Sequence, residues 1–207
     1  MLLADIGNRY AHLFDGQEVR DLEYNELFLR YKDSKIYYIN VNPNIQKELS
    51  SISSWINLEP FVKLDGAYKT MGIDRQVLLL SANDGLYIDA GSAITIDLKI
   101  DNRFVGGTIL PGIWRIKECY KEISSKLYID TLNRVNIAKL PDSTTKDSIS
   151  YGIIAPIVAL IEKINKDNLP IYITGGDGEL LSQYVNGKFD RFLIFKGMQK
   201  VIKEHIC

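Results

Sequence analysis

The segment Asp89-Ala90-Gly91-Ser92-Ala93-Ile94-Thr95-Ile96-Asp97 decides the fold prediction for this chain of 207 residues. Its small residues lie between two apolar runs, 86–88 and 94–100, so the segment predicts two strands joined by a tight polar turn. Glycine and alanine let backbone N–H groups approach an anion, hydroxyl groups add donors, and carboxylates can hold the cations that accompany a nucleotide. The segment therefore indicates a phosphate-binding turn.

Two other parts of the chain repeat this pattern of an apolar run followed by glycine. Residues 1–8 have the sequence Met-Leu-Leu-Ala-Asp-Ile-Gly-Asn, and residues 171–178 have the sequence Ile-Tyr-Ile-Thr-Gly-Gly-Asp-Gly. Three such segments in one short chain predict a nucleotide cleft lined by loops from two halves.

The turn Asn83-Asp84-Gly85 is the predicted boundary between an N-terminal half, 1–84, and a C-terminal half, 85–207. Three strands, a helix, a strand and a helix are expected in each half, which predicts a duplicated α/β unit. After a β-meander within 2–20, the expected strands are 36–41, 61–64, 86–90, 93–100, 103–110, 170–174 and 191–195, and the expected helices are 22–31, 44–55, 73–82, 113–124, 145–165, 179–185 and 198–205. Pro156 predicts a kink or a local break in the helix at 145–165.

The composition is that of an ordinary globular protein, with 46% hydrophobic residues. Twenty-five Lys and Arg oppose 26 Asp and Glu, and the resulting net charge of -1 gives no electrostatic reason to expect nucleic acid or an acidic membrane as a partner. The apolar stretches are shorter than the roughly 20 residues of a spanning helix, and Met1 leads directly into a strand, so we expect a cytoplasmic protein. Cys119 and Cys207 are interpreted as ordinary thiols.

Carboxylates are the predicted source of acid and base chemistry. The chain has neither a G-x-x-x-x-G-K-[ST] loop nor a G-x-G-x-x-G loop, and its two histidines are His12 and His205. Four aspartates follow or interrupt apolar runs, where a charge is costly unless it has a partner, and they are Asp5, Asp74, Asp89 and Asp97.

Each of these features also has an ordinary structural explanation. An Asp-x-Gly sequence after a strand is often a turn, and Gly106-Gly107 is also consistent with a bulge. The segment 174–177 is also consistent with a strand-to-helix connection, and Thr145 with a helix cap.

Taken together, six motifs in order resemble those of the type III pantothenate kinase family. They are Asp5-Ile6-Gly7-Asn8, Gly72-Ile73-Asp74-Arg75, Asp89 to Asp97, Gly106-Gly107-Thr108-Ile109-Leu110-Pro111-Gly112, Thr145 to Gly152, and Thr174-Gly175-Gly176-Asp177. The resemblance implies the fold of the acetate and sugar kinase and actin-like ATPase superfamily, with two ribonuclease-H-like halves around a nucleotide cleft. It implies ATP-dependent phosphorylation of pantothenate to 4'-phosphopantothenate, the first step of coenzyme A biosynthesis.

The resemblance also implies roles for individual residues. The first phosphate loop, which binds ATP, comprises Asp5, Ile6, Gly7, Asn8, Arg9, Tyr10, Ala11 and His12, with Asp5 acting on the phosphates through Mg²⁺. The pantothenate-binding residues are Tyr68, Gly72, Ile73, Asp74, Arg75 and Thr145, with Asp74 as the base. Asp89 is implied to bind a monovalent cation, K⁺ or NH₄⁺, and Ser92 to contact ATP.

Two positions depart from the family pattern, because Arg9 and Ser92 both stand where the family usually has threonine. Arg9 replaces a hydroxyl by a long cation, whereas Ser92 keeps the hydroxyl. Two alternative functions stay open at this point: a superfamily kinase for another small hydroxy acid, or a non-catalytic nucleotide-binding regulator on the same scaffold.

A homodimer is the expected assembly. The helix at 149–164 is apolar on most of its circumference, and only one stripe can face its own sheet. The family resemblance implies the same dimer, with Thr145 close to the interface.

Overall fold

The computed structural model describes residues 1–206 and divides by its internal contacts into two compact units. The first unit comprises Met1–Asp84, Asp97–Gly106 and Arg191–Cys207, and the second comprises Gly85–Ile96 and Gly107–Asp190. The division after Asp84 therefore lies where a boundary was expected, but 97–106 and 191–207 group with the N-terminal segment. The division into ribonuclease-H-like halves 1–84 and 85–207 stays a prediction.

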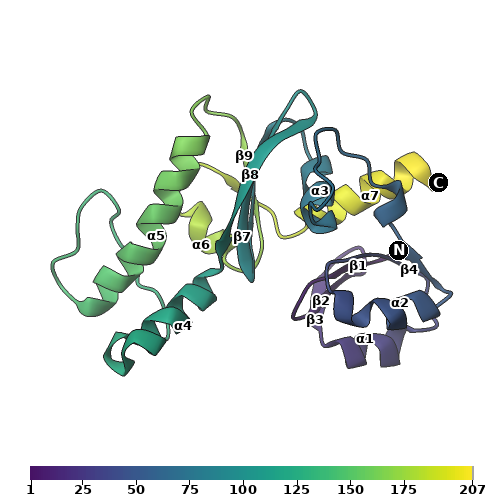
Figure 1. Ribbon diagram of the computed structural model, residues 1–207, viewed down its shortest axis with the longest axis horizontal. Helices are drawn as coiled ribbons and strands as arrows, with labels where there is room; N and C mark the ends of the chain where they lie inside the picture. The colour runs from purple at the N-terminus through teal and green to yellow at the C-terminus, as the bar shows by residue number, and fades with distance from the viewer. Residues whose placement is uncertain (207) are drawn as a thin grey trace. The chain divides into compact units, whose positions relative to one another are not determined.

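The first unit contains a five-stranded sheet in the order β3-β2-β1-β4-β5 (Figure 1). Its strands are β1 (Leu2–Ile6), β2 (Ala11–Phe14), β3 (Val19–Leu22), β4 (Ile36–Asn40) and β5 (Trp55–Asn57). The first three form an antiparallel meander, whereas β4 pairs in parallel with both β1 and β5. In this register Asp5 lies opposite His12.

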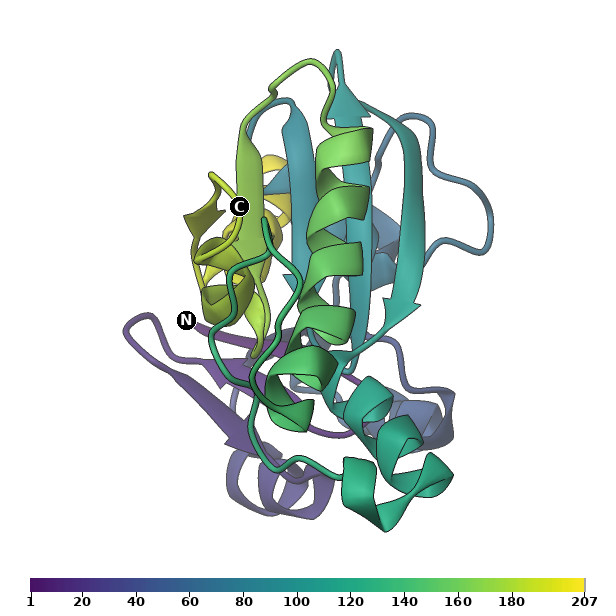
Figure 2. The same ribbon diagram turned by 90° about the vertical axis from the view of Figure 1, so that its left-hand side faces the viewer.

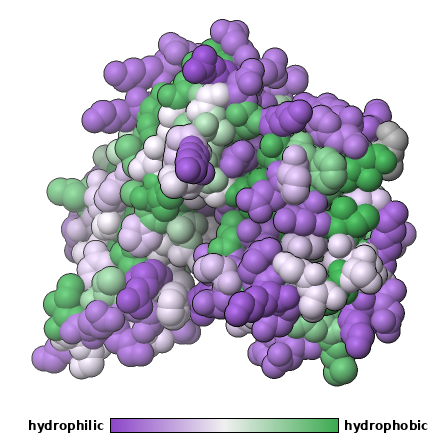
Figure 3. Space-filling view, turned by 45° about the vertical axis from the view of Figure 1, so that its right-hand side comes forward, coloured by the Kyte–Doolittle hydropathy of each residue, from purple (hydrophilic) through white to green (hydrophobic). Residues whose placement is uncertain are grey.

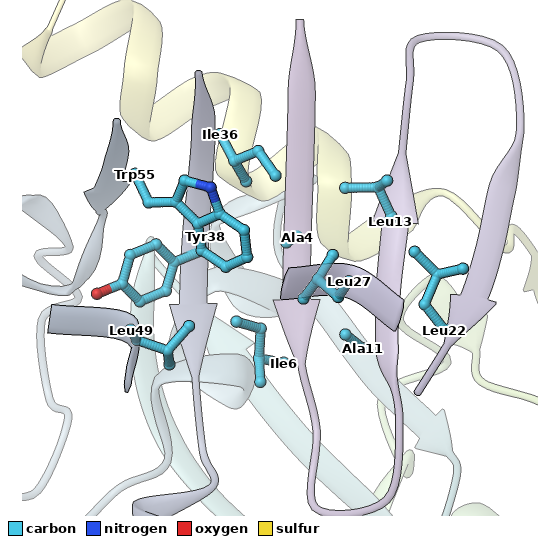
Figure 4. Close-up of a cluster of buried hydrophobic side chains, with 10 residues drawn as sticks. All are labelled: Ala4, Ile6, Ala11, Leu13, Leu22, Leu27, Ile36, Tyr38, Leu49 and Trp55. Atoms are coloured by element: carbon cyan, nitrogen blue, oxygen red, sulfur yellow. The ribbon is translucent and has the colours of Figure 1, made fainter. Parts of the chain in front are cut away.

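Alternation along β1 separates a hydrophobic face of this sheet from a face that carries Asp5. Ala4 and Ile6 point toward a cluster that includes side chains from α1 (Tyr24–Tyr31) and α2 (Gln46–Ser51). Figure 4 shows the cluster on one face of the sheet, with α7 (Leu193–His205) passing behind; its members are Ala4, Ile6, Ala11, Leu13, Leu22, Leu27, Ile36, Tyr38, Leu49 and Trp55.

Helix α3 (Ile73–Leu80) packs against α7 in the first unit. The backbones of the two helices approach closely at Gly197, where a Cβ atom would overlap the carbonyl group of Val77. The segment 97–106 joins this unit partly through a hydrogen bond of 2.8 Å from the Phe104 N–H to the Asp65 carbonyl.

The second sheet has the order β10-β9-β6-β7-β8, the same order as the first sheet when each is numbered from its own first strand. Its strands are β6 (Gly85–Ala90), β7 (Ala93–Ile100), β8 (Arg103–Pro111), β9 (Ile171–Thr174) and β10 (Lys188–Phe189). Both β9 and β10 continue the sheet in parallel beyond β6. This repeated order confirms the predicted duplicated α/β topology.

Three helices belong to the second unit: α4 (Ile113–Ile123), α5 (Thr145–Ile164) and α6 (Gly178–Ser182). Figure 2 shows α5 running along one face of this sheet. Its buried residues include Ile149, Ile153, Ile157 and Ile161, which recur at helical spacing and face the core. Short 3₁₀ helices occupy Pro43–Ile45, Glu59–Phe61 and Ser125–Leu127.

Several predicted elements are wrong in type or extent. The expected strand at 61–64 is absent, and 59–61 forms a 3₁₀ helix instead. The expected strand at 191–195 is the beginning of α7, because its apolar run continues at helical spacing through Met198, Val201 and Ile202. The expected helix at 44–55 is divided into a 3₁₀ turn, α2 and the start of β5. Helix α5 is continuous through Pro156, without the predicted break.

Candidate active site

The predicted phosphate loop connects β1 and β2 and is tied to its neighbours by a short chain of hydrogen bonds. The Gly7 N–H donates to the Tyr10 carbonyl at 3.1 Å. The Gly7 carbonyl in turn accepts a bond of 2.7 Å from the Tyr24 hydroxyl, whose oxygen accepts one of 3.0 Å from Asn42 Nδ2. Asn42 is buried, so this chain of bonds anchors the loop to the interior of the unit.

Asp5 lies on β1 just before this loop, in surroundings that disfavour its ionised form. Burial raises the pKa of Asp5 from 3.8 to about 6, while the charge of His12 lowers it and that of Asp74 raises it. His12 is itself paired with Asp21, with 2.6 Å between Nδ1 and Oδ1. The structure therefore brings Asp5, His12 and Asp74 into one interacting group of charges.

A cavity of about 380 Å³ lies beside this loop in the first unit. It is lined by Arg9, Tyr10, Glu23, Tyr24 and Asn25. Arg9 and Tyr10 are predicted phosphate-loop residues, and the other three belong to the beginning of α1 or precede it.

Asp74 lies in the first turn of α3, directly after Gly72 and Ile73. Asp74 Oδ1 accepts a hydrogen bond of 2.8 Å from the Arg75 N–H. In this conformation the carboxylate lies next to Gly72. A Cβ atom at Gly72 would overlap Asp74 Oδ1, so a larger residue at this position would displace the carboxylate. Burial raises the pKa of Asp74; the Arg75 N–H and the Arg75 charge oppose this rise, and the charge of Asp97 adds to it.

Arg75 extends from α3 to β7 and to the loop before α3. Its Nε donates to Asp97 Oδ2 at 2.9 Å, its Nη2 to Asp97 Oδ1 at 2.5 Å, and its Nη1 to the Tyr68 hydroxyl at 2.6 Å. Arg75 is 5% exposed and Asp97 is 0% exposed. The structure therefore places the guanidinium, which the resemblance assigns to substrate, in a buried bidentate ion pair.

Asp97 and Lys99 are parts of this arrangement to which sequence reasoning gave no role. The sequence singled out Asp97 only as a carboxylate within an apolar run, and it did not single out Lys99. Lys99 is 2% exposed, and its Nζ donates to the carbonyl oxygens of Leu79 and Ala82 at 2.5 Å each, at the C-terminal end of α3. Burial lowers the pKa of Lys99 to about 8. Asp97 and Lys99 are two residues apart on β7, and this spacing places both side chains on the face toward α3. The alternation along the strand is the signal in the sequence that could have found them.

The second unit gathers the other glycine-rich motifs at one place. The Gly112 N–H donates to the Ser92 carbonyl at 3.1 Å, and the Asp177 N–H donates to the Ala90 carbonyl at 2.9 Å. Gly175 has a φ of 88°, and a Cβ atom there would lie 2.5 Å from Asp89 Oδ1. The turn at 89–93 thus closes against both Gly112 and the loop at 174–177, which needs glycine for this contact.

Thr145 is the first residue of α5 and is exposed. The N-cap is Thr144, whose Oγ1 accepts from the Asp147 N–H at 3.0 Å. Donors from Thr144, Asn133 and Ser143 lower the pKa of Asp147 to about 2. This ordered first turn fixes the backbone that carries Thr145.

The predicted site residues are thus divided between the two units. Asp5 to His12, Tyr68 and Gly72 to Arg75 belong to the first unit, whereas Asp89, Ser92 and Thr145 belong to the second. Within residues 1–206 no group of three or more His, Cys, Asp or Glu side chains could hold a metal ion by itself. Over the same residues, no helix is both long and apolar enough to cross a membrane.

Among solved structures, the chain resembles a conserved protein from Campylobacter jejuni that was named as a Baf family transcriptional activator. The TM-score is 0.87, with 40% identity over 99% of this chain and 98% of the other. A protein from Sinorhizobium meliloti named as a 2-dehydro-3-deoxygalactonokinase matches with a TM-score of 0.53 at 10% identity, covering 99% of this chain and 96% of the other. This second likeness shows a shared fold and agrees with the predicted sugar kinase and actin-like superfamily.

Curated relatives agree on one family. The chain is 41% identical to the type III pantothenate kinase of Campylobacter jejuni, over 99% of this chain and 98% of the relative. It is 36% identical to that of Sulfurimonas denitrificans and 33% identical to that of Helicobacter hepaticus, each over the full length of both chains. The family model for type III pantothenate kinase matches residues 25–167. The chain therefore belongs to the type III pantothenate kinase family.

Proposed function

We propose that this enzyme, which phosphorylates pantothenate with ATP in coenzyme A biosynthesis, uses Asp74 as the base that accepts the proton of the attacking hydroxyl. The observation that carries the proposal is the half-buried position of Asp74 in the first turn of α3, where Gly72 leaves room for its carboxylate. Burial raises the pKa of Asp74, which strengthens it as a base. Phosphoryl transfer depends mainly on positioning and charge neutralisation, so an aspartate that takes the proton late in the step is sufficient.

Asp5 and its loop are proposed to bind the phosphates of ATP through Mg²⁺. The donor set fits, because Mg²⁺ is usually held by one or two carboxylates together with substrate phosphates and waters, and Asp5 supplies a half-buried carboxylate. The ion would neutralise charge on the phosphoryl group. Arg9, which lines the adjacent cavity, is proposed to face the nucleotide in place of the usual threonine.

Asp89 and Ser92 are proposed to serve the nucleotide from the second unit, Asp89 with a monovalent cation and Ser92 through its exposed hydroxyl. Carboxylate and backbone carbonyl oxygens are ligands that suit such a hard cation. The close packing of Gly175 on Asp89 and Ala90 supports this assignment, because it holds the turn at 89–93 in a fixed shape.

A homodimer, with Thr145 contacting pantothenate near the interface, is proposed on the family resemblance. Ile157 does not lie on the stripe of α5 that could contact a partner, as first expected, because it is 4% exposed and packs in its own unit. The exposed residues Gly152, Pro156 and Ala159 form another stripe of the helix and are small enough for close helix packing. On the face shown in Figure 3, hydrophobic residues are interspersed with hydrophilic ones.

A cytoplasmic enzyme without nucleic-acid or membrane partners is also proposed. The near balance of charge, with a net charge of -1, supports this. The direct test of the overall function is an assay of ADP release by the purified protein with ATP, Mg²⁺, K⁺ and a panel of hydroxy acids. We expect ADP release with pantothenate and with no other acid of the panel. Release with a different acid would favour the alternative kinase, and none at all would favour a binding protein.

Asp74→Asn is expected to lower kcat by about 10²- to 10⁴-fold, because asparagine keeps the shape of aspartate but cannot take the proton. The midpoint of thermal unfolding should not fall, since the change removes a half-buried charge whose ionised form is disfavoured in the folded protein. The matched control is Asp142→Asn, an exposed aspartate paired with Lys139, which should retain wild-type kcat. Near-normal turnover by Asp74→Asn would remove Asp74 as the base.

Asp5→Asn is expected to stabilise the protein at neutral pH while it abolishes turnover. The raised pKa means that folded Asp5 holds its proton more tightly than unfolded Asp5, so its contribution to stability is present below pH 4 and is lost as the pH rises toward about 6. At pH 7.5 the gain for Asp5→Asn should be on the order of 2 to 3 kcal/mol. Urea unfolding with a chelator present, from pH 4 to pH 7.5, measures this, and identical pH curves for the variant and wild type would contradict it.

Activity is expected to be higher in K⁺ than in Na⁺, because a site shaped for the larger ion holds the smaller one poorly. Asp89→Asn should lose this dependence, while Asp177→Asn, a neighbouring half-buried aspartate, should keep it. Initial rates at constant ionic strength measure the effect. Equal wild-type rates in both salts would count against a selective monovalent site, although not against the kinase reaction.

Wild-type protein is expected to sediment as a dimer at micromolar concentration, and Ala159→Glu as a folded monomer, because it places a charge on the proposed interface. Leu29→Glu is the control, because Leu29 is exposed on α1, outside the proposed interface. Ile157→Glu, by contrast, should unfold the second unit. A fully active wild-type monomer would refute the dimer.

A further inference from the structure

Three side chains of the first unit form a continuous chain of contacts from a buried strand to solvent. Asp97, fully buried on β7, accepts two hydrogen bonds from Arg75, and Arg75 donates a third bond to Tyr68. Tyr68 is 46% exposed. The inner end of the chain is therefore fixed by the core, and the outer end is exposed to solvent.

The directions of these hydrogen bonds determine what Tyr68 can offer to a ligand. A guanidinium has only donors, so the Tyr68 oxygen must be the acceptor in the bond of 2.6 Å from Arg75 Nη1. The single hydroxyl proton of Tyr68 is consequently directed away from Arg75 and can be donated elsewhere. A donor that also accepts from a cation is polarised and becomes a stronger donor.

Aromatic contacts restrict the ring that carries this hydroxyl. The Tyr68 ring lies 5.9 Å from the Phe104 ring, and the Arg75 guanidinium carbon lies 5.9 Å from each ring centroid. The Tyr68 ring, Phe104 of β8 and the Arg75 guanidinium thus form one mutually contacting group. Fixing both the ring and its oxygen leaves little freedom for the hydroxyl proton.

The charge of Arg75 is already balanced before any substrate arrives. Both oxygens of Asp97 bond the same guanidinium in a nearly solvent-free position, so the pair presents little net charge to an anion. An anionic substrate is therefore attracted less by the paired Arg75 than it would be by a free arginine. A neutral hydrogen-bond donor that points at the substrate then contributes more to its binding free energy than the charge of Arg75 does. This points to Tyr68 as the group through which Arg75 acts.

We propose that Asp97 is a positioning residue for pantothenate binding, which holds Arg75 so that Arg75 aims the Tyr68 hydroxyl at an oxygen atom of pantothenate. This inference rests on the proposed assignment of Tyr68 to the acceptor site. It gives Asp97 a role in binding without contact with the substrate, and it makes Arg75 the connecting member of the chain.

A double-mutant cycle tests the proposed coupling. Tyr68→Phe and Asp97→Asn should each raise the Kd for pantothenate, measured by calorimetry, by about 3- to 10-fold, the loss expected for one hydrogen bond. The double variant should bind no more weakly than the weaker single variant, because both changes remove the same bond. In all three variants kcat should fall much less than in Asp74→Asn.

Lys99→Met is the matched control. Lys99 lies two residues from Asp97 on the same face of β7 and is buried, but it contacts the other end of α3. Its effect on Kd should be additive with that of Tyr68→Phe. Equal coupling for Lys99→Met and Asp97→Asn would show general disruption of α3 and would overturn the proposal.

Arg75→Lys gives a second test if Asp97→Asn does not fold. Lysine keeps a positive charge beside Asp97 but cannot span both Asp97 and Tyr68 as the guanidinium does. Tyr68→Phe should then have no additional effect on Kd in the Arg75→Lys background, whereas a full additional effect would overturn the proposal. Failure of the wild type to bind and phosphorylate pantothenate would instead refute the proposed function itself.

Discussion

The buried ion pair between Arg75 and Asp97 is the constraint on which the first-unit part of the site depends. Removing both charges from water is costly, and the pair is tolerated because two hydrogen bonds join it within the core. The pair fixes the first turn of α3, which carries Asp74. Lys99 fixes the last turn of the same helix by donating to its terminal carbonyls. One face of β7 therefore holds both ends of the helix that carries Asp74, the proposed base.

Glycine supplies the complementary constraint, since loops that hold phosphates need close backbone approach. Gly72 leaves space for the Asp74 carboxylate, and Gly112 and Gly175 let two loops close on the turn at 89–93. At Gly175 the positive φ adds a backbone reason to the steric one. These three glycines lie in motifs that indicated nucleotide chemistry in the sequence, so the same residues also determine how closely the chain packs at those motifs.

Sequence patterns predicted the elements that have strong local signals. The strands around 86–110 alternate or form long apolar runs, and the repeated order of strands and glycine turns predicted the duplication. Local signals failed for β5 and β10, which have only three and two residues. They also failed at 191–195, where a short apolar run by itself is compatible with a strand and the helical spacing appears only with Met198, Val201 and Ile202. The partner of Asp97 could not be predicted because it lies 22 residues away on another element.

Electrostatic strain connects the stability of the site to its chemistry. Burial raises the pKa of both Asp5 and Asp74, and their negative charges repel each other. The folded protein is therefore less stable when both are ionised. The same burial makes Asp74 a stronger base and leaves Asp5 with a carboxylate that gains from a cation. The Arg75 charge lowers the pKa of Asp74 and the Asp97 charge raises it, while burial remains the largest effect on this carboxyl group. By pairing with the guanidinium, Asp97 thus offsets part of the effect of Arg75, which favours the proposed role of Asp74 as a base.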